Sequence, residues 1–328
     1  SENIEFVLIM DISKTLSIIL MMTLSVSCGL QGNKEGKTQD TVAAPDNAGG
    51  NVDRFPYPDI PLMLSSPDER KAYLLRHYWD EFDFADTTLV NNRELIGKAF
   101  VNCISMLADE TISTELVRDG IDNFCSAMEK HEHARMVCMR MVDDLLYDVN
   151  LPFYNERLYA VYLERMLESD RLDNARKGAL KFRLDLMRRN SPGSIAADFR
   201  YRMPDGRSRT LLGTPVSGNR LLLVFFDPEC HSCKDIMMQM IEDRDLSMAV
   251  AEGKLTVMAV YTEGNEEVWK RTCSSMPEGW IVGNDGMSIN DGALYDLKAM
   301  PSLYLLDNGK KVILKDAPYA EVRRNLGF

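Results

Sequence analysis

The sequence predicts two folded domains of class α + α/β, an N-terminal helical bundle followed by an α/β domain with a central mixed sheet. Two observations predict this class. Over residues 52–192, apolar residues recur at three- and four-residue steps, the period of an amphipathic helix. Over residues 193–328, short apolar runs bounded by turn residues alternate with helical stretches. At 328 residues, the chain is long enough for each domain to bury its own core.

Composition and charge restrict the function. The hydrophobic content of 45% and charged content of 27% are typical of a folded, soluble protein. The formal net charge is −12 and no basic cluster offsets it, so we expect no nucleic acid as a partner.

The first 51 residues predict a leader and a linker. Within residues 1–28, Lys14 precedes a short apolar run and small residues, the order of a secretory signal. A short buried helix or an uncleaved anchor is the alternative for so short a run. Residues 29–51 are almost free of apolar side chains and predict a flexible tether. The cysteine after "LSVS", Cys28, resembles a bacterial lipoprotein cleavage site, which implies lipidation of Cys28 and a membrane anchor.

Six helical stretches follow the tether. The first starts at "SPDERKAYLLRHYWDEFDF", with Ser66 as the expected N-cap and Pro67 at the first helical position. The other stretches are predicted at 92–109, 112–130, 132–149, 155–168 and 171–189. The aromatic group at 77–84 could be a docking surface, but an aromatic stripe on a helix is usually core.

The helical region offers weak candidates for a site. His131, His133 and Cys138 are zinc-ligand types, but residues two apart on a helix face different directions, so a polar helix start is the better interpretation. Cys103, Cys125 and Cys138 fall among apolar positions, which favours buried free thiols. In an exported protein, two of them could instead form a disulfide.

The second region predicts the pattern strand, helix, strand, helix, hairpin, helix, with helices on both faces of the sheet. Strands are predicted at 221–226, 254–262, 301–307 and 310–316, the last two joined by Asn-Gly at 308–309. Helices are predicted at 231–251, 265–274 and 318–328.

The C-x-x-C pair of Cys230 and Cys233 carries the chemistry. A strand that leads into it at the first turn of a helix exposes the first sulfur and points free backbone N–H groups at it. This favours the thiolate, which is the nucleophile, and the spacing lets Cys233 attack a mixed disulfide on Cys230. A zinc site would need two more ligands, and the region adds His231 and Cys273 alone.

Three segments, "GSIAADFRYRMPDGRSRTLL", "LLLVFFDPECHSCK" and "MPSLYLLDNGKKV", resemble the thioredoxin superfamily, in particular the extracytoplasmic thiol–disulfide oxidoreductases of the TlpA and ResA type. The resemblance covers residues 193–328 and implies a thioredoxin-like α/β domain. The helical region, with "YLLRHYWDEFDF", resembles an uncharacterised module that precedes thioredoxin domains in lipoproteins of Bacteroides-like bacteria.

The resemblance implies roles for the matching residues. Cys230 would attack and Cys233 would resolve, and the pair would be a redox-active disulfide that needs no organic cofactor or metal. Pro301 matches the family's cis-proline, whose loop lies against the cysteine pair and pairs its backbone with the substrate chain. The surroundings of the pair and the substrate loop would be formed by Asp227, Glu229, His231, Ser232, Met300 and Pro301.

Two positions depart from the family. Glu229 stands where a tryptophan is common, and Val224 replaces a buried acid. Asp227 and Glu229 would oppose ionisation of Cys230 and protonated His231 would favour it, so the sequence leaves the pKa of this thiol open.

The leading hypothesis is a lipid-anchored thiol–disulfide oxidoreductase of the cell envelope, facing the periplasm. Its partners would be protein thiols and disulfides and a membrane electron donor, and the resemblance favours the reductant direction. A peroxidase would need a hydroxyl where Asp227 stands, and a copper carrier would need a histidine late in the domain, whereas the last is His231. The alternative is a binding or scaffolding lipoprotein whose thioredoxin-like domain is redox-inactive.

Overall fold

The computed structural model describes residues 54–149 and 151–328. The predicted signal segment with Cys28 and the predicted tether lie outside the described residues. Among the described residues, none of the helices has the length and apolar character needed to cross a membrane. Residues 54–149 and 151–328 belong to one compact unit, so the domain boundary predicted between 192 and 193 stays a prediction.

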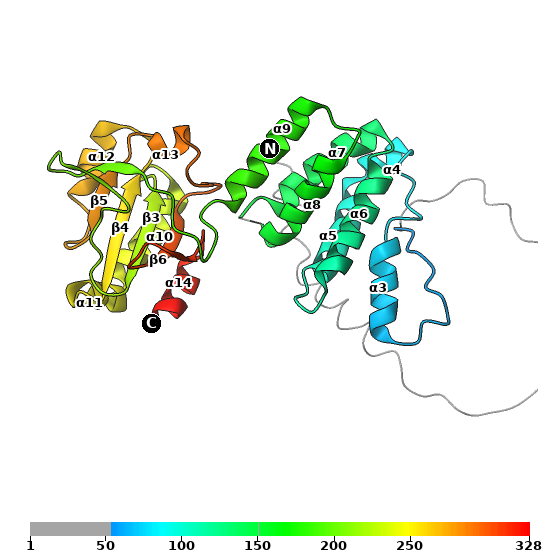
Figure 1. Ribbon diagram of the computed structural model, residues 1–328, viewed down its shortest axis with the longest axis horizontal. Coiled ribbons are helices and arrows are strands. Elements are labelled where there is room, and N and C mark those ends of the chain that lie inside the picture. The colour runs from blue at the N-terminus through cyan, green and yellow to red at the C-terminus, as the bar shows by residue number, and fades with distance from the viewer. Residues whose placement is uncertain (1–53, 150) are drawn as a thin grey trace, which may run out of the picture. The chain divides into compact units, whose positions relative to one another are not determined.

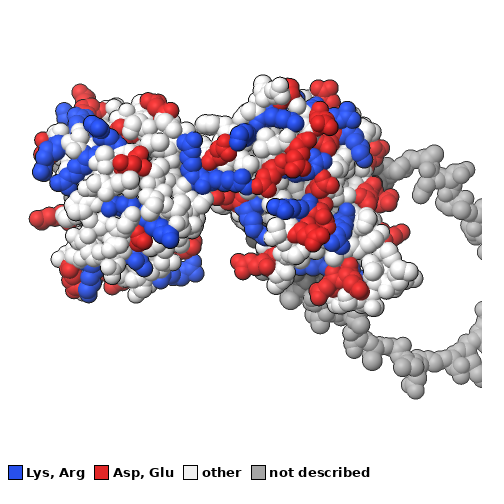
Figure 2. Space-filling model, in the orientation of Figure 1, with Lys and Arg blue, Asp and Glu red and all other residues white. Residues whose placement is uncertain are grey.

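Helices make up the described chain from residue 67 to 188, which we call the helical part. They are α3 (Pro67–His77), α4 (Thr87–Asn91), α5 (Arg93–Leu107), α6 (Thr114–Met128), α7 (Glu132–Leu146), α8 (Glu156–Glu168) and α9 (Asn174–Arg188) (Figure 1). Figure 2 shows acidic and basic side chains interspersed on the surface of this part.

Local capping explains where these helices start. The Ser66 hydroxyl accepts from the Glu69 N–H while the Glu69 carboxylate accepts from the Ser66 N–H, and Pro67 fills the first helical position. The N-cap predicted at Ser66 is therefore confirmed. The short helix α4 was not predicted, because its Thr-Thr-Leu-Val-Asn sequence has low helix propensity and depends on the Asp86 cap.

The helical part encloses its own apolar core. The aromatic group in and after α3 is core rather than a docking surface, since Trp79 is 1% exposed and its ring centroid lies 4.9 Å from that of Phe124. Cys103, Cys125 and Cys138 are all buried and unbridged, so the prediction of buried free thiols is confirmed.

The remaining elements, from residue 200 onward, are called the sheet part. Its strands are β1 (Arg200–Arg202), β2 (Ser208–Thr210), β3 (Arg220–Phe226), β4 (Leu255–Tyr261), β5 (Ile281–Asn284), β6 (Ser302–Asp307) and β7 (Val312–Leu314). Its helices are α10 (His231–Glu242), α11 (Arg244–Ala251), α12 (Glu266–Cys273), α13 (Ser288–Asp291) and α14 (Tyr319–Leu326).

The seven described strands form one mixed sheet in the order β2-β1-β5-β4-β3-β6-β7. Strands β3, β4 and β5 run parallel to one another, and β6 lies antiparallel to β3. One face packs against α10, α11, α12 and α14, and the other against α13 and residues that flank β1 and β2, among them Phe199 and Leu211. The predicted mixed sheet with helices on both faces is confirmed, although the second face carries a single short helix.

The structure corrects three details. The helix predicted over 231–251 is broken at Asp243, whose carboxylate accepts from the N–H groups of Asp245 and Leu246 and starts α11. Strands β1, β2 and β5 were missed because three or four residues give too short an alternation. The predicted hairpin of β6 and β7 is present, but β7 covers Val312–Leu314 rather than 310–316, and Lys310 before it has left-handed backbone.

Candidate active site

The cysteine pair lies where β3 passes into α10, at the end of a strand in the middle of the sheet. Cys230 is the N-cap residue of α10, with extended backbone, and Cys233 lies in the first helical turn. The loop between them and β3 is closed by two contacts of Asp227, whose carbonyl accepts from the Cys230 N–H and whose carboxylate accepts from the Glu229 N–H. This arrangement matches the strand-to-helix setting predicted from the sequence.

The Cys230 thiol is half-buried, and its pKa lies below the ordinary value. The largest cause is the hydrogen bond from the Ser232 hydroxyl, whose Oγ lies 3.0 Å from Cys230 Sγ. The second cause is the backbone N–H of Cys233, one of the free donors of the first helical turn. The thiolate of Cys230 is therefore stabilised by donors that the helix start provides.

The Ser232 hydroxyl serves two acceptors with one proton. It donates to the Met300 carbonyl at 2.8 Å and lies within reach of Cys230 Sγ. A hydroxyl has one donor, so it can bond the carbonyl while Cys230 is a thiol and turn to the sulfur when Cys230 ionises.

Cys233 has the opposite environment. Its side chain is fully buried, and burial raises its pKa to about 12. The Asp227 N–H, 3.4 Å from Cys233 Sγ, offsets this in part. Val224, where related proteins carry a buried acid, belongs to the same apolar cluster as Cys233. The second cysteine is thus held as a thiol while the first favours the thiolate.

The loop before β6 lies against the pair. The Met300–Pro301 peptide bond is cis, as the resemblance implied. The Met300 carbonyl oxygen is 3.9 Å from Cys230 Sγ and accepts from Ser232. The structure therefore brings together Cys230, Ser232 and the backbone of Met300, residues separated by about seventy positions in the sequence.

The three charged neighbours considered in the sequence analysis contribute little to the pKa shift of Cys230. Glu229 is exposed, and His231 is 93% exposed, with its imidazole 3.7 Å from the carboxylate of Asp235. None of Asp227, Glu229 and His231 is among the main causes that shift Cys230. The contact that the sequence could not provide is the position of the Ser232 hydroxyl, which depends on how α10 begins.

The other candidate residues do not come together in a common site. His133 contacts Asn91 through its Nε2, 2.9 Å from the amide oxygen, whereas Cys138 is buried in the core on the same helix. Cys273 ends α12, half-buried, with a pKa raised by burial. Within residues 54–149 and 151–328, no three His, Cys, Asp or Glu side chains form a group that could hold a metal ion.

Comparisons with known proteins support this picture of the fold. A thioredoxin-like protein from Bacteroides caccae, known from its crystal structure, is 31% identical; the match covers 83% of this chain and 98% of that one, with a TM-score of 0.71. A conserved protein of unknown function from Bacteroides fragilis is 34% identical over 42% of this chain and 98% of its own, with a TM-score of 0.39. No curated protein matches the chain.

Residues 27–190 match a family model described as a domain of unknown function, DUF5106. This match covers half of the chain and contains the helical part. The Bacteroides caccae relative spans both the helical and the sheet parts, because it covers 83% of the chain. The chain therefore belongs to the DUF5106 family and, with that relative, to the thioredoxin-like proteins.

Proposed function

We propose that the protein is a thiol–disulfide oxidoreductase in which Cys230 attacks and Cys233 resolves. This proposal rests on the opposite environments of the two sulfurs at the start of α10, which differ in burial and in the direction of the pKa shift. Cys230 is accessible and its pKa is lowered, whereas Cys233 is buried and its pKa is raised. A pair that served as a structural staple would have no need for this asymmetry, and so short a loop gains little stability from closure.

The reaction balances without a cofactor. The Cys230 thiolate attacks one sulfur of a substrate disulfide, forming a mixed disulfide and expelling the other sulfur as a thiolate. That leaving thiolate takes the proton of Cys233. The Cys233 thiolate then attacks Cys230 Sγ, breaks the mixed disulfide and expels the second substrate sulfur as a thiolate, which takes up the proton that Cys230 lost to water on ionising. The substrate gains two electrons, and the protein is left with a Cys230–Cys233 disulfide that a thiol donor must reduce.

We further propose that the protein works as a reductant in the cell envelope. The resemblance to the TlpA and ResA type supports this direction, a membrane electron donor and a periplasmic location. The lipoprotein-like segment before Cys28 supports a lipid anchor. The proposed substrates are protein disulfides, since a half-buried but accessible cysteine beside a backbone carbonyl suits an extended polypeptide.

Insulin reduction tests the proposed activity. With dithiothreitol as electron donor, the purified chain should accelerate precipitation of the insulin B chain well above the uncatalysed rate. The matched control is the double variant Cys230→Ser/Cys233→Ser, which keeps the size of both side chains. Equal rates for the wild type and this variant would contradict an oxidoreductase function and favour the binding lipoprotein instead.

A further inference from the structure

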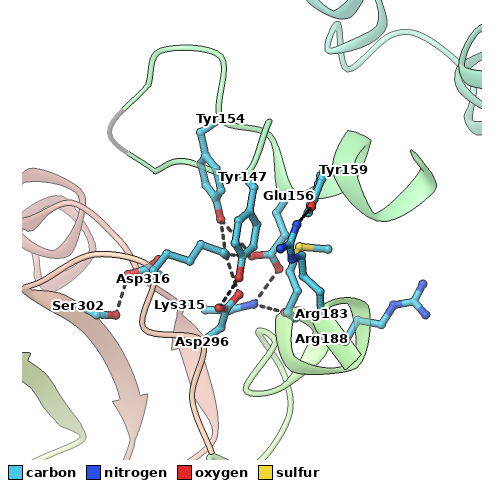
Figure 3. Close-up of polar contacts among 12 residues, drawn as sticks. Tyr147, Tyr154, Glu156, Tyr159, Arg183, Arg188, Asp296, Ser302, Lys315 and Asp316 are labelled. Atoms are coloured by element: carbon cyan, nitrogen blue, oxygen red, sulfur yellow. Dashed lines mark hydrogen bonds and ion pairs between the residues drawn. The ribbon is translucent and has the colours of Figure 1, made fainter. Parts of the chain in front are cut away.

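A buried polar cluster joins the helical part to the loop that lies against Cys230. From the helical part it includes Tyr147, Tyr154 and Glu156, and from the sheet part Asp296, all labelled in Figure 3. Lys298 of the sheet part completes it. The Lys298 side chain is 2% exposed and that of Asp296 is 4% exposed. Charges so deeply buried are rare unless each one is paired.

Lys298 is the centre of this cluster. Its Nζ lies 3.0 Å from the Asp296 carboxylate, 3.3 Å from that of Glu156 and 3.1 Å from the Tyr154 hydroxyl. The same ammonium lies 5.1 Å from the ring centroids of both Tyr147 and Tyr154. Two tyrosines and a glutamate of the helical part thus surround a lysine of the sheet part.

A second connection holds the far side of the same loop. Lys315 is 5% exposed, and its ammonium lies 2.8 Å from the Glu156 carboxylate and bonds the Met187 carbonyl of α9. The next residue, Asp316, accepts from the Ser302 hydroxyl at 2.6 Å (Figure 3). Ser302 directly follows Pro301, so Glu156 is connected to both flanks of the Met300–Pro301 bond.

These contacts end at the cysteine pair. Lys298 is two residues from Met300, whose carbonyl accepts from Ser232 and lies 3.9 Å from Cys230 Sγ. A shift of the segment 296–302 would move that carbonyl away from the sulfur. The loss should therefore fall on a substrate that bonds this carbonyl, rather than on the reaction of the Cys230 sulfur itself.

We propose that Lys298 is a positioning residue, held by Tyr147, Tyr154 and Glu156, through which the helical part keeps the Met300 carbonyl against Cys230 for reaction with polypeptide disulfides. This inference rests on the proposed function and gives the helical part a role in it. A small disulfide that needs no backbone contact should react independently of Lys298. The cluster should therefore affect polypeptide substrates selectively.

The test compares Lys298→Met with the wild type in the full chain. Lys298→Met should lower kcat/KM for insulin about tenfold or more, mostly through KM, because the loop that contacts the polypeptide is displaced. The rate of 5,5′-dithiobis(2-nitrobenzoate) with Cys230 should stay within about twofold. Hydrogen exchange in a peptide covering 294–303 should rise, while a peptide covering β3 should be unchanged.

Three further variants make the test specific. Lys298→Arg keeps the charge and should restore part of the insulin rate. Tyr154→Phe removes one hydroxyl and keeps the ring; it replaces Lys298→Met if that variant does not fold, with an expected loss of about threefold. Lys98→Met removes an exposed lysine that pairs with Glu94 in α5, and should change nothing.

The outcomes separate the two proposals. If the wild-type protein does not reduce insulin, the proposed function is wrong. Hydrogen exchange at 294–303 in Lys298→Met would still test the positioning role, because it does not depend on activity. Unchanged exchange there in Lys298→Met, or in Tyr154→Phe as its replacement, would overturn the inference. So would equal losses toward insulin and the small disulfide, or exchange that rises equally in β3, because each indicates general destabilisation.

Discussion

Cys233→Ser should trap the protein on its substrate. The Cys230 thiolate still attacks an insulin disulfide, but the variant lacks the second thiol that releases the product, so a covalent adduct accumulates. Turnover should fall to the uncatalysed rate. Mass spectrometry under non-reducing conditions should detect the chain with one insulin chain attached, and dithiothreitol should release it.

The reverse variant distinguishes the two roles. Cys230→Ser should form no adduct, because Cys233 is buried and its pKa of about 12 leaves almost no thiolate at neutral pH. Cys273→Ser is the matched control, since Cys273 lies half-buried at the end of α12 and should be dispensable. An adduct that forms on Cys233 in Cys230→Ser would reverse the assignment of the attacking sulfur.

Ser232→Ala should make Cys230 less reactive at neutral pH. The hydroxyl of Ser232 is the largest cause that lowers the pKa of Cys230, so its loss moves that pKa toward the ordinary value. Because the thiolate fraction at a fixed pH falls as the pKa rises, alkylation by iodoacetamide at pH 7 should slow about threefold to fivefold, a modest effect because the site faces water. The pH profile of alkylation should shift to higher pH.

Two comparisons identify the hydroxyl as the cause. Ser232→Thr keeps the hydroxyl and should retain most of the wild-type profile. Ser247→Ala removes an exposed serine of α11 and should leave the profile unchanged. A profile of Ser232→Ala that overlays the wild type would show that the backbone N–H groups of the helix start determine the pKa alone.

The sequence predicted the elements that carry long apolar patterns and missed those that depend on partners. Strands β3 and β4 are continuous apolar runs in the middle of the sheet, and the helices with strong periodicity appear close to their predicted bounds. Strands β1 and β2 have three residues each, mostly charged or polar, and exist because β1 pairs with both β2 and β5. The break at Asp243 is a capping contact, which a long helical period conceals.

The same distinction applies to the site. Spacing alone predicted that Cys230 and Cys233 share the start of a helix, and the resemblance located Pro301. The position of the Ser232 hydroxyl between Met300 and Cys230 could not be predicted, because Met300 comes close to Ser232 only in the folded chain. The buried Lys298 gave no signal, because its partners Tyr154 and Glu156 lie more than 140 positions earlier in the chain.

The reduction potential of the Cys230–Cys233 pair tests the central claim most directly. It is measured by equilibrating the chain in glutathione or dithiothreitol buffers and counting free thiols after alkylation. We expect a fully exchanging pair with a potential near or below that of thioredoxin, roughly −270 mV. A value near −120 mV, roughly that of the strong oxidant DsbA, would reverse the direction of electron flow. A pair that never exchanges in the folded protein would contradict the redox function altogether.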